Sequence, residues 1–158
     1  MKIKEIDHPV LYHLSKVAGL TTLEPRVPRA IVNRIRGSFE DSSIERISFA
    51  ESIDGCILGL QLSASTFTDH VQRFYVHRLV SCDRLLSNDE VTRRKLVFDS
   101  RVTGEWWGLS DAIVKQVGEI EVSDIGSRAI EYEPLRGDRS MMKQNGKLET
   151  YLYKWRVI

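Results

Sequence analysis

The sequence predicts an α+β fold built on an antiparallel β-sheet with a few short helices. Segments rich in β-branched and aromatic residues greatly outnumber segments with helical periodicity. The two expected helices both fall in the first half, so strands and helices do not alternate as they do in parallel α/β folds. A chain of 158 residues suits one domain, which we expect to span residues 1–158.

The expected strands are short apolar runs bounded by proline, glycine or polar residues. The first follows Pro9 and contains Leu11 and Leu14, and the second has the sequence R-I-S-F-A. In chain order the expected strands are residues 10–14, 46–50, 73–80, 95–98, 104–109, 115–122, 129–132 and 150–158.

Helical periodicity is clearest in residues 51–60, where apolar side chains recur at positions i, i+3, i+4 and i+7. Residues 29–37 alternate arginines with apolar residues and predict a short basic helix or loop. The other segments are rich in proline or polar residues and are expected to be extended or irregular: 19–28, 37–45 and 87–94.

The charge balance argues against a protein that coats nucleic acid. Lysine plus arginine total 23 and aspartate plus glutamate total 22, a net charge of +1. Nucleic acid is a possible partner that this balance does not support.

The two cysteines and four histidines lack zinc-ligand spacing, so no metal is expected. The charged N-terminus and the short apolar runs predict a cytoplasmic protein without a membrane partner, in a host cytosol if a phage encodes it.

Four segments carry a family resemblance through their order and spacing. They are L-Y-H-L-S at 11–15, L-E-P-R-V-P at 23–28, R-I-S-F-A-E-S at 46–52 and T-G-E-W-W-G-L at 103–109. Together they resemble the ADP-ribosyltransferase superfamily, most clearly its poly(ADP-ribose)-polymerase-like, diphtheria-toxin-like branch. The resemblance covers roughly residues 10–122 and implies a split antiparallel sheet with a few short helices. It also implies NAD as substrate.

By this resemblance Glu105 is the catalytic carboxylate. Cleavage of NAD passes through an oxocarbenium-like transition state that an anion near the ribose stabilises. His13 would hold a ribose, and the backbone of Leu14 would grip the nicotinamide amide. Ser15 matches the family's hydroxyl, and Arg26 would pair with the phosphates.

The sequence departs from the family where a nicotinamide-stacking tyrosine is expected. Ser48 occupies that position, and Phe49 lies one place along and so points to the other face of a strand. Polymer synthesis is therefore not expected. The leading hypothesis is a mono-ADP-ribosyltransferase or NAD-cleaving relative with a macromolecular acceptor, which we expect to be a protein.

Two alternatives stay open. One is a catalytically silent domain of this fold that binds a nucleotide or a protein partner, for example as a phage or mobile-element effector. The other is an RNA 2′-phosphotransferase-like enzyme. Under the family hypothesis His13, Ser48 and Glu105 line one cleft on neighbouring strands. Cys56 is expected to be buried and without a disulfide.

Overall fold

All of the strands described here belong to one antiparallel sheet. The structure is a computed structural model that describes residues 8–27, 43–60, 71–97, 100–126 and 129–149. Its strands are β1 (Tyr12–Ser15), β2 (Thr22–Leu23), β3 (Ile47–Ala50), β4 (Val71–Cys82), β5 (Leu85–Leu86), β6 (Glu105–Gly108), β7 (Ala112–Gly126), β8 (Ala129–Gly137) and β9 (Gly146–Glu149). Its helices are α1 (Ile53–Gly59), α2 (Asn88–Arg93), α3 (Ser100–Thr103) and α4 (Arg139–Met142).

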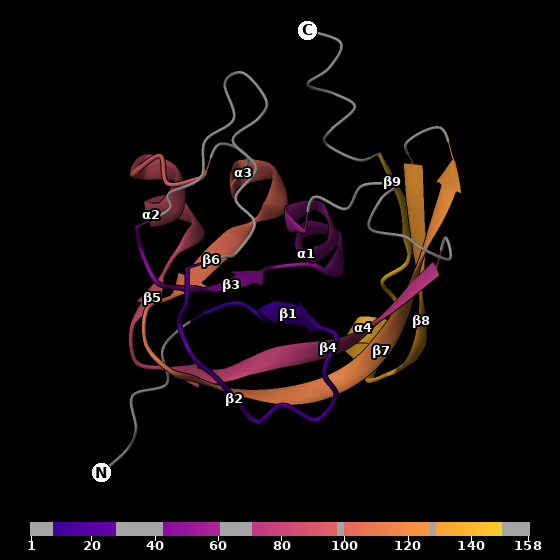
Figure 1. The fold of residues 1–158 in the computed structure, drawn as a ribbon, viewed down its shortest axis with the longest axis horizontal. Coiled ribbons are helices and arrows are strands. Elements are labelled where there is room, and N and C mark those ends of the chain that lie inside the picture. The colour runs from indigo at the N-terminus through magenta and orange to yellow at the C-terminus, as the bar shows by residue number, and fades with distance from the viewer. Residues whose placement is uncertain (1–7, 28–42, 61–70, 98–99, 127–128, 150–158) are drawn as a thin grey trace, which may run out of the picture.

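The strand order is β5-β6-β3-β1-β4-β7-β8-β9, with β2 paired to the start of β7. The long strands β4 and β7 curve beneath β1 and β3, while α1, α2 and α3 lie together above β3 and β6 (Figure 1). The predicted α+β class with a mostly antiparallel sheet is confirmed. No helix in the described part of the chain is long and apolar enough to cross a membrane.

The strands β1, β3 and β6 bury apolar side chains on both faces. The helix face, which lies against α1 and α2, carries Tyr12, Leu14, Ser48, Ala50, Glu105 and Trp107. The turn face, which lies on the side of β2, carries Leu11, His13, Ile47, Phe49 and Trp106. Each fully buried large apolar side chain contributes about 1.5–3 kcal/mol to folding, so both faces are needed for stability.

Helix α1 is positioned by its caps and by one close approach. The Ser52 hydroxyl accepts from the N–H of Gly55 at 3.0 Å, and the Gln144 side chain accepts from the N–H of Ile53 at 2.9 Å. A Cβ on Gly55 would lie 1.9 Å from the carbonyl oxygen of Thr103. Glycine at this position therefore lets α1 and α3 pack together over β3 and β6.

Several sequence predictions need correction. Residues 87–94 were expected to be an irregular connection but contain α2, in whose first turn the Glu90 N–H donates to the Ser87 hydroxyl. Residues 95–98 do not form a strand within the described range, because Lys95 has a φ of 54° and Leu96 turns into the core. Helices α3 and α4 and strand β9 were not predicted, so helices are not confined to the first half.

The remaining predicted elements fall into two groups. The strands expected at 10–14, 46–50, 73–80, 104–109, 115–122 and 129–132 correspond to β1, β3, β4, β6, β7 and β8, and the helix expected at 51–60 corresponds to α1. The basic segment 29–37, most of 37–45 and the strand expected at 150–158 lie outside the described residues.

Candidate functional site

The residues singled out by the sequence lie on three neighbouring strands. In the antiparallel register Tyr12 of β1 is paired with Ala50 of β3, and Ala50 is paired with Glu105 of β6. Two residues before Ala50 on β3, Ser48 is paired with Trp107 of β6. The expectation that these residues come from adjacent strands is confirmed.

The side chains of these strands divide between the two faces of the sheet. Ser48 and Glu105 point to the helix face, because their cross-strand partners alternate together. His13 points to the turn face, where its ring meets that of Phe49 edge-on with centroids 6.0 Å apart. The prediction that His13, Ser48 and Glu105 line one cleft is therefore wrong. Adjacent strands bring their backbones together, but strand parity sends the imidazole and the carboxylate in opposite directions.

Glu105 is held by protein donors. Its side chain is only 8% exposed, and Oε1 accepts from the Ser48 hydroxyl at 3.0 Å and from the Trp107 indole N–H at 2.9 Å. The side chain of Asn88 donates to the Glu105 backbone carbonyl at 2.9 Å. The carboxylate therefore ties β3 to β6 on the helix face, and the Glu105 backbone carbonyl ties β6 to α2.

The ladder between β1 and β3 stops after one registered pair, Tyr12 with Ala50. Beyond it the imidazole of His13 bridges the two strands, and its Nδ1–H donates to the carbonyl oxygen of Ser48 at 2.9 Å. Leu14 is paired with Val76 of β4 and has no registered partner on β3. The two strands therefore part at His13, and the side chain fills the place where the next ladder bond would lie.

His13 is electrically neutral at neutral pH. Burial lowers its pKa below the ordinary value of 6.5, the Ser48 carbonyl opposes this, and the positive charge of Arg26 lowers it further. Because the Nδ1–H donates to the Ser48 carbonyl oxygen, Nε2 has a lone pair. No hydrogen bond to Nε2 is formed by the described residues, and Nε2 can accept a hydrogen bond from a hydroxyl group of a ligand.

Ser15 follows His13 by two residues on β1, and the charge of Arg26 acts on His13. Arg26 is exposed, and its backbone forms a two-way bridge with Arg46 next to β3, with both N–O distances at 3.1 Å. Ser15 ends β1, and its hydroxyl accepts from the N–H of Val17 at 3.0 Å. Arg26 is therefore near enough for its charge to act on His13, whose imidazole lies on the sheet face opposite to the Glu105 carboxylate.

No family model, no curated protein and no solved structure matches this chain. The case for a site therefore rests on the geometry of the chain itself.

Sequence reasoning missed two polar residues beside His13. His77 of β4 is the cross-strand partner of His13, and Gln116 of β7 is the partner of His77. His77 is fully buried, although its neighbours in β4 read as an ordinary apolar strand. The sequence signal that could have revealed this pair was a histidine in each of two expected strands, residues 10–14 and 73–80, which a prediction of strand pairing could have placed side by side.

Sequence reasoning also missed a buried cation. Arg46 is 2% exposed, and its guanidinium stacks over the Trp107 ring at 4.2 Å from the ring centre. This cation–π contact supports the indole that donates to Glu105. Arg46 and Trp107 therefore stabilise the Glu105 position from the helix face.

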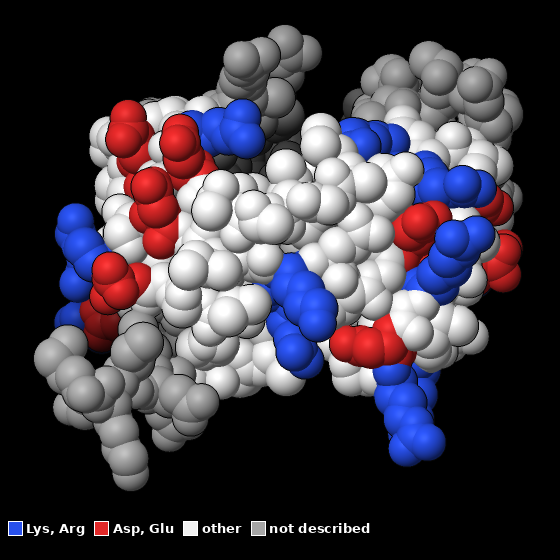
Figure 2. Space-filling view, turned by 90° about the horizontal axis from the view of Figure 1, so that it is seen from below, with Lys and Arg blue, Asp and Glu red and all other residues white. Residues whose placement is uncertain are grey.

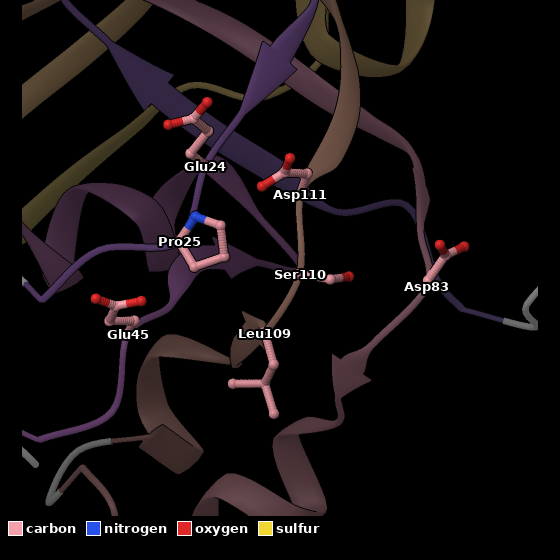
Figure 3. A pocket seen from close by; sticks show the side chains of 7 residues that line it. All are labelled: Glu24, Pro25, Glu45, Asp83, Leu109, Ser110 and Asp111. Carbon is pink, nitrogen blue, oxygen red and sulfur yellow. The ribbon is translucent and has the colours of Figure 1, made fainter.

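A separate hollow of about 590 Å³ lies at the end of the sheet near β2 and β5. It is lined by Glu24, Pro25, Glu45, Asp83, Leu109, Ser110 and Asp111. Figure 3 shows Glu45 and Asp83 at opposite sides of it, and the carboxylates do not converge on one point. No group of three or more His, Cys, Asp or Glu side chains among the described residues is arranged to hold a metal ion.

Charges of both signs are interspersed on the face seen in Figure 2. Acidic side chains gather at the left-hand end with basic side chains beside them, and further basic side chains stand in the middle and, with acidic ones, at the right. A continuous basic stripe of the kind that follows a phosphate backbone is not present among the described residues on this face.

Both cysteines are free thiols. Cys56 is half-buried rather than fully buried as predicted, and its Sγ donates to the carbonyl oxygen of Tyr12 at 3.3 Å. Burial raises the pKa of the Cys56 thiol to about 12, so it is not a reactive thiolate. Cys82, on which no prediction was made, is the more buried of the two.

Proposed function

We propose that this chain binds an NAD-type dinucleotide and does not turn it over through Glu105, which lies on the sheet face opposite to His13 and so outside the single cleft expected of an ADP-ribosyltransferase. The proposed binding position is the place where β1 and β3 part. The observation that carries the proposal is the neutral imidazole of His13, which spans this parting with Nδ1 on Ser48 and Nε2 available as an acceptor.

The chemistry of the position suits a dinucleotide. A ribose hydroxyl can donate to Nε2 of a neutral histidine. The backbone of Leu14 lies beyond the registered β1–β3 pair, where an amide of the ligand can meet it. Arg26 supplies a positive charge that acts on His13, and guanidinium groups suit phosphate oxygens. These features agree with the roles that the family resemblance implies for His13, Leu14 and Arg26.

The surroundings of Glu105 argue against catalysis by this residue. Stabilising an oxocarbenium ion requires a carboxylate that faces the ribose. Glu105 instead faces the helix side of the sheet, and both Ser48 and Trp107 already donate to its Oε1. A silent binding domain explains this arrangement more simply than an enzyme does.

A transferase that uses Glu105 is the competing function, and one observation favours it. Ser48 is exposed, and its hydroxyl reaches the otherwise buried Glu105 carboxylate. A ligand that displaces the Ser48 hydroxyl would meet the carboxylate there. In that case the acceptor and the reaction would be those expected for a mono-ADP-ribosyltransferase.

Calorimetric titration with NAD and with ADP-ribose, alongside an assay for released nicotinamide, separates these functions. We expect both ligands to bind the wild-type protein, His13→Ala to weaken binding by about tenfold or more, and no nicotinamide to appear. Phosphate binding by Arg26 predicts a similar loss for Arg26→Ala. Nicotinamide release that Glu105→Gln abolishes would establish the transferase instead. Absence of binding by either ligand would overturn the proposal.

A further inference from the structure

We propose that His77 and Gln116 form a proton-sensitive latch, in which a neutral His77 holds the turn of residues 16–20 against the sheet and a protonated His77 releases it. The inference does not depend on the proposed nucleotide. It rests on three polar side chains in a row on the turn face.

The row crosses three strands. His13 of β1, His77 of β4 and Gln116 of β7 are successive cross-strand partners, so their side chains share one face. The turn between β1 and β2 is bonded to two of them. The N–H of Leu20 donates to Nε2 of His77 at 3.2 Å, and the N–H of Gly19 donates to Oε1 of Gln116 at 2.6 Å.

The bond from Leu20 fixes the chemical state of His77. A nitrogen that accepts a hydrogen bond must have a free lone pair, so the proton of the neutral ring sits on Nδ1. Nδ1 of this fully buried side chain forms no hydrogen bond of ordinary geometry with the described residues, although the Tyr75 carbonyl on the same strand is near enough to act on the ring. Nε2 is therefore the nitrogen through which His77 holds the turn.

Protonation of His77 would break the latch directly. A proton on Nε2 would face the N–H of Leu20, turning an attraction into a repulsion between two donors. Burial lowers the pKa of His77, and the neighbouring His13 lowers it further, while the Tyr75 carbonyl on the same strand opposes the shift. From the other elements, Gln116 of β7 faces His77 as a neutral amide.

Within the part of the chain that the structure describes, the other charged groups near His77 do not stabilise a cation there. Arg26 acts on His13 and is itself positive. Lys16, in the turn, is directed to the Phe74 ring, with Nζ 4.1 Å from the ring centre. A protonated His77 is therefore more stable in contact with water than in its buried position. The turn that covers it is the segment that can move to expose it.

The turn has few other attachments. Residues 16–19 are exposed, and within the turn the N–H of Val17 donates back to Ser15. Leu20 packs against the apolar cluster of the turn face, and Lys16 lies over the Phe74 ring. Segments with few buried contacts and side-chain anchors open at low free energy, so loss of the His77 bond should open this turn before the sheet unfolds.

Hydrogen exchange of single amides tests the latch in the intact chain. After correction for the intrinsic rate, we expect protection of the Leu20 amide to fall by about tenfold or more between about pH 7 and about pH 5. His77→Gln keeps an acceptor but cannot titrate, so its Leu20 protection should be independent of pH. His8→Gln is the matched control and should behave as the wild type does. Constant protection in the wild type, or an equal fall in His77→Gln, overturns the proposal.

A second measurement covers the case in which His77→Gln does not fold. The ¹⁵N shifts of the wild-type imidazoles report which ring nitrogen carries the proton. We expect His77 to be the Nδ1–H tautomer at neutral pH and to titrate in step with the exchange of the Leu20 amide. An Nε2–H tautomer would contradict the assigned hydrogen bond and with it the latch.

Discussion

The Nδ1–H of His13 donates to the carbonyl oxygen of Ser48 at 2.9 Å, across two strands whose ladder stops one residue earlier. This single bond fixes the tautomer of His13 and leaves its Nε2 as an acceptor. The same bond joins the backbone of Ser48 on β3 to His13 on β1, although the Ser48 and His13 side chains lie on opposite faces of the sheet.

The Glu105 carboxylate is predicted to stabilise the fold. Glu105→Ala removes the acceptor of the buried Trp107 N–H and should lower the free energy of unfolding by about 3 kcal/mol. Glu51 is the matched control, because it accepts from the Trp106 N–H at 2.9 Å but is exposed. Glu51→Ala should cost less than about 1 kcal/mol. Urea denaturation of both variants measures the difference, and equal losses would contradict the structural role.

Two glycines of α1 should respond oppositely to the same change. Gly55→Ala places a Cβ 1.9 Å from the Thr103 carbonyl oxygen and should destabilise the protein by about 3 kcal/mol, because a backbone atom cannot yield cheaply. Gly59→Ala meets nothing within 4 Å and should stabilise by up to about 1 kcal/mol. Thermal or urea unfolding tests the pair. A mild effect at Gly55 would show that α1 and α3 are packed less closely than described.

Helix α2 is predicted to depend on its N-cap. Ser87→Ala removes the acceptor of the Glu90 N–H and should lower stability by about 1 kcal/mol. Ser87→Asn preserves an acceptor and should recover most of the loss. The midpoint of urea unfolding compares the two variants. A loss in Ser87→Asn as large as in Ser87→Ala would mean that the hydroxyl acts elsewhere.

Most of the fold could be predicted from the sequence because its strands are apolar runs with β-branched residues, and α1 has a clear helical period. Helix α2 was missed because its S-N-D-E start is polar throughout, and such segments also form loops. The signal was present, since Ser87 followed three residues later by Glu90 is a capping-box pattern.

The site was predicted less well, and strand parity explains why. The motifs placed His13 and Glu105 on neighbouring strands of one sheet, β1 and β6 with β3 between them, but which face each side chain takes depends on the register between strands. One residue of register reverses every side chain, and the sequence carries no record of pairing. The partnership of His77 with His13 depends on the same long-range register.

The free energy of unfolding is predicted to fall as the pH is lowered through the range in which histidine titrates. The pKa values of His13 and His77 are lowered in the folded state, so the unfolded chain takes up protons first, near the ordinary value of 6.5. The contribution of neutral His13 and His77 to the free energy of unfolding is therefore complete above about pH 6.5 and is lost progressively as the pH falls below this value. Urea midpoints between about pH 8 and about pH 5 should show the fall. The urea midpoint of His77→Gln should fall less on acidification than that of the wild type. A wild-type midpoint that rises on acidification would contradict the predicted direction.

The most direct test of the proposed function follows the His13 imidazole by NMR while NAD is added. We predict that its Nε2 resonance shifts in a saturable way, as a ribose hydroxyl donates to it, while His8 does not respond and no nicotinamide is released. The same titration with Glu105→Gln should give the same shift and affinity. If NAD binds while the His13 ring stays unchanged, or if the His13 resonances never move up to about millimolar NAD, the proposed binding position is wrong.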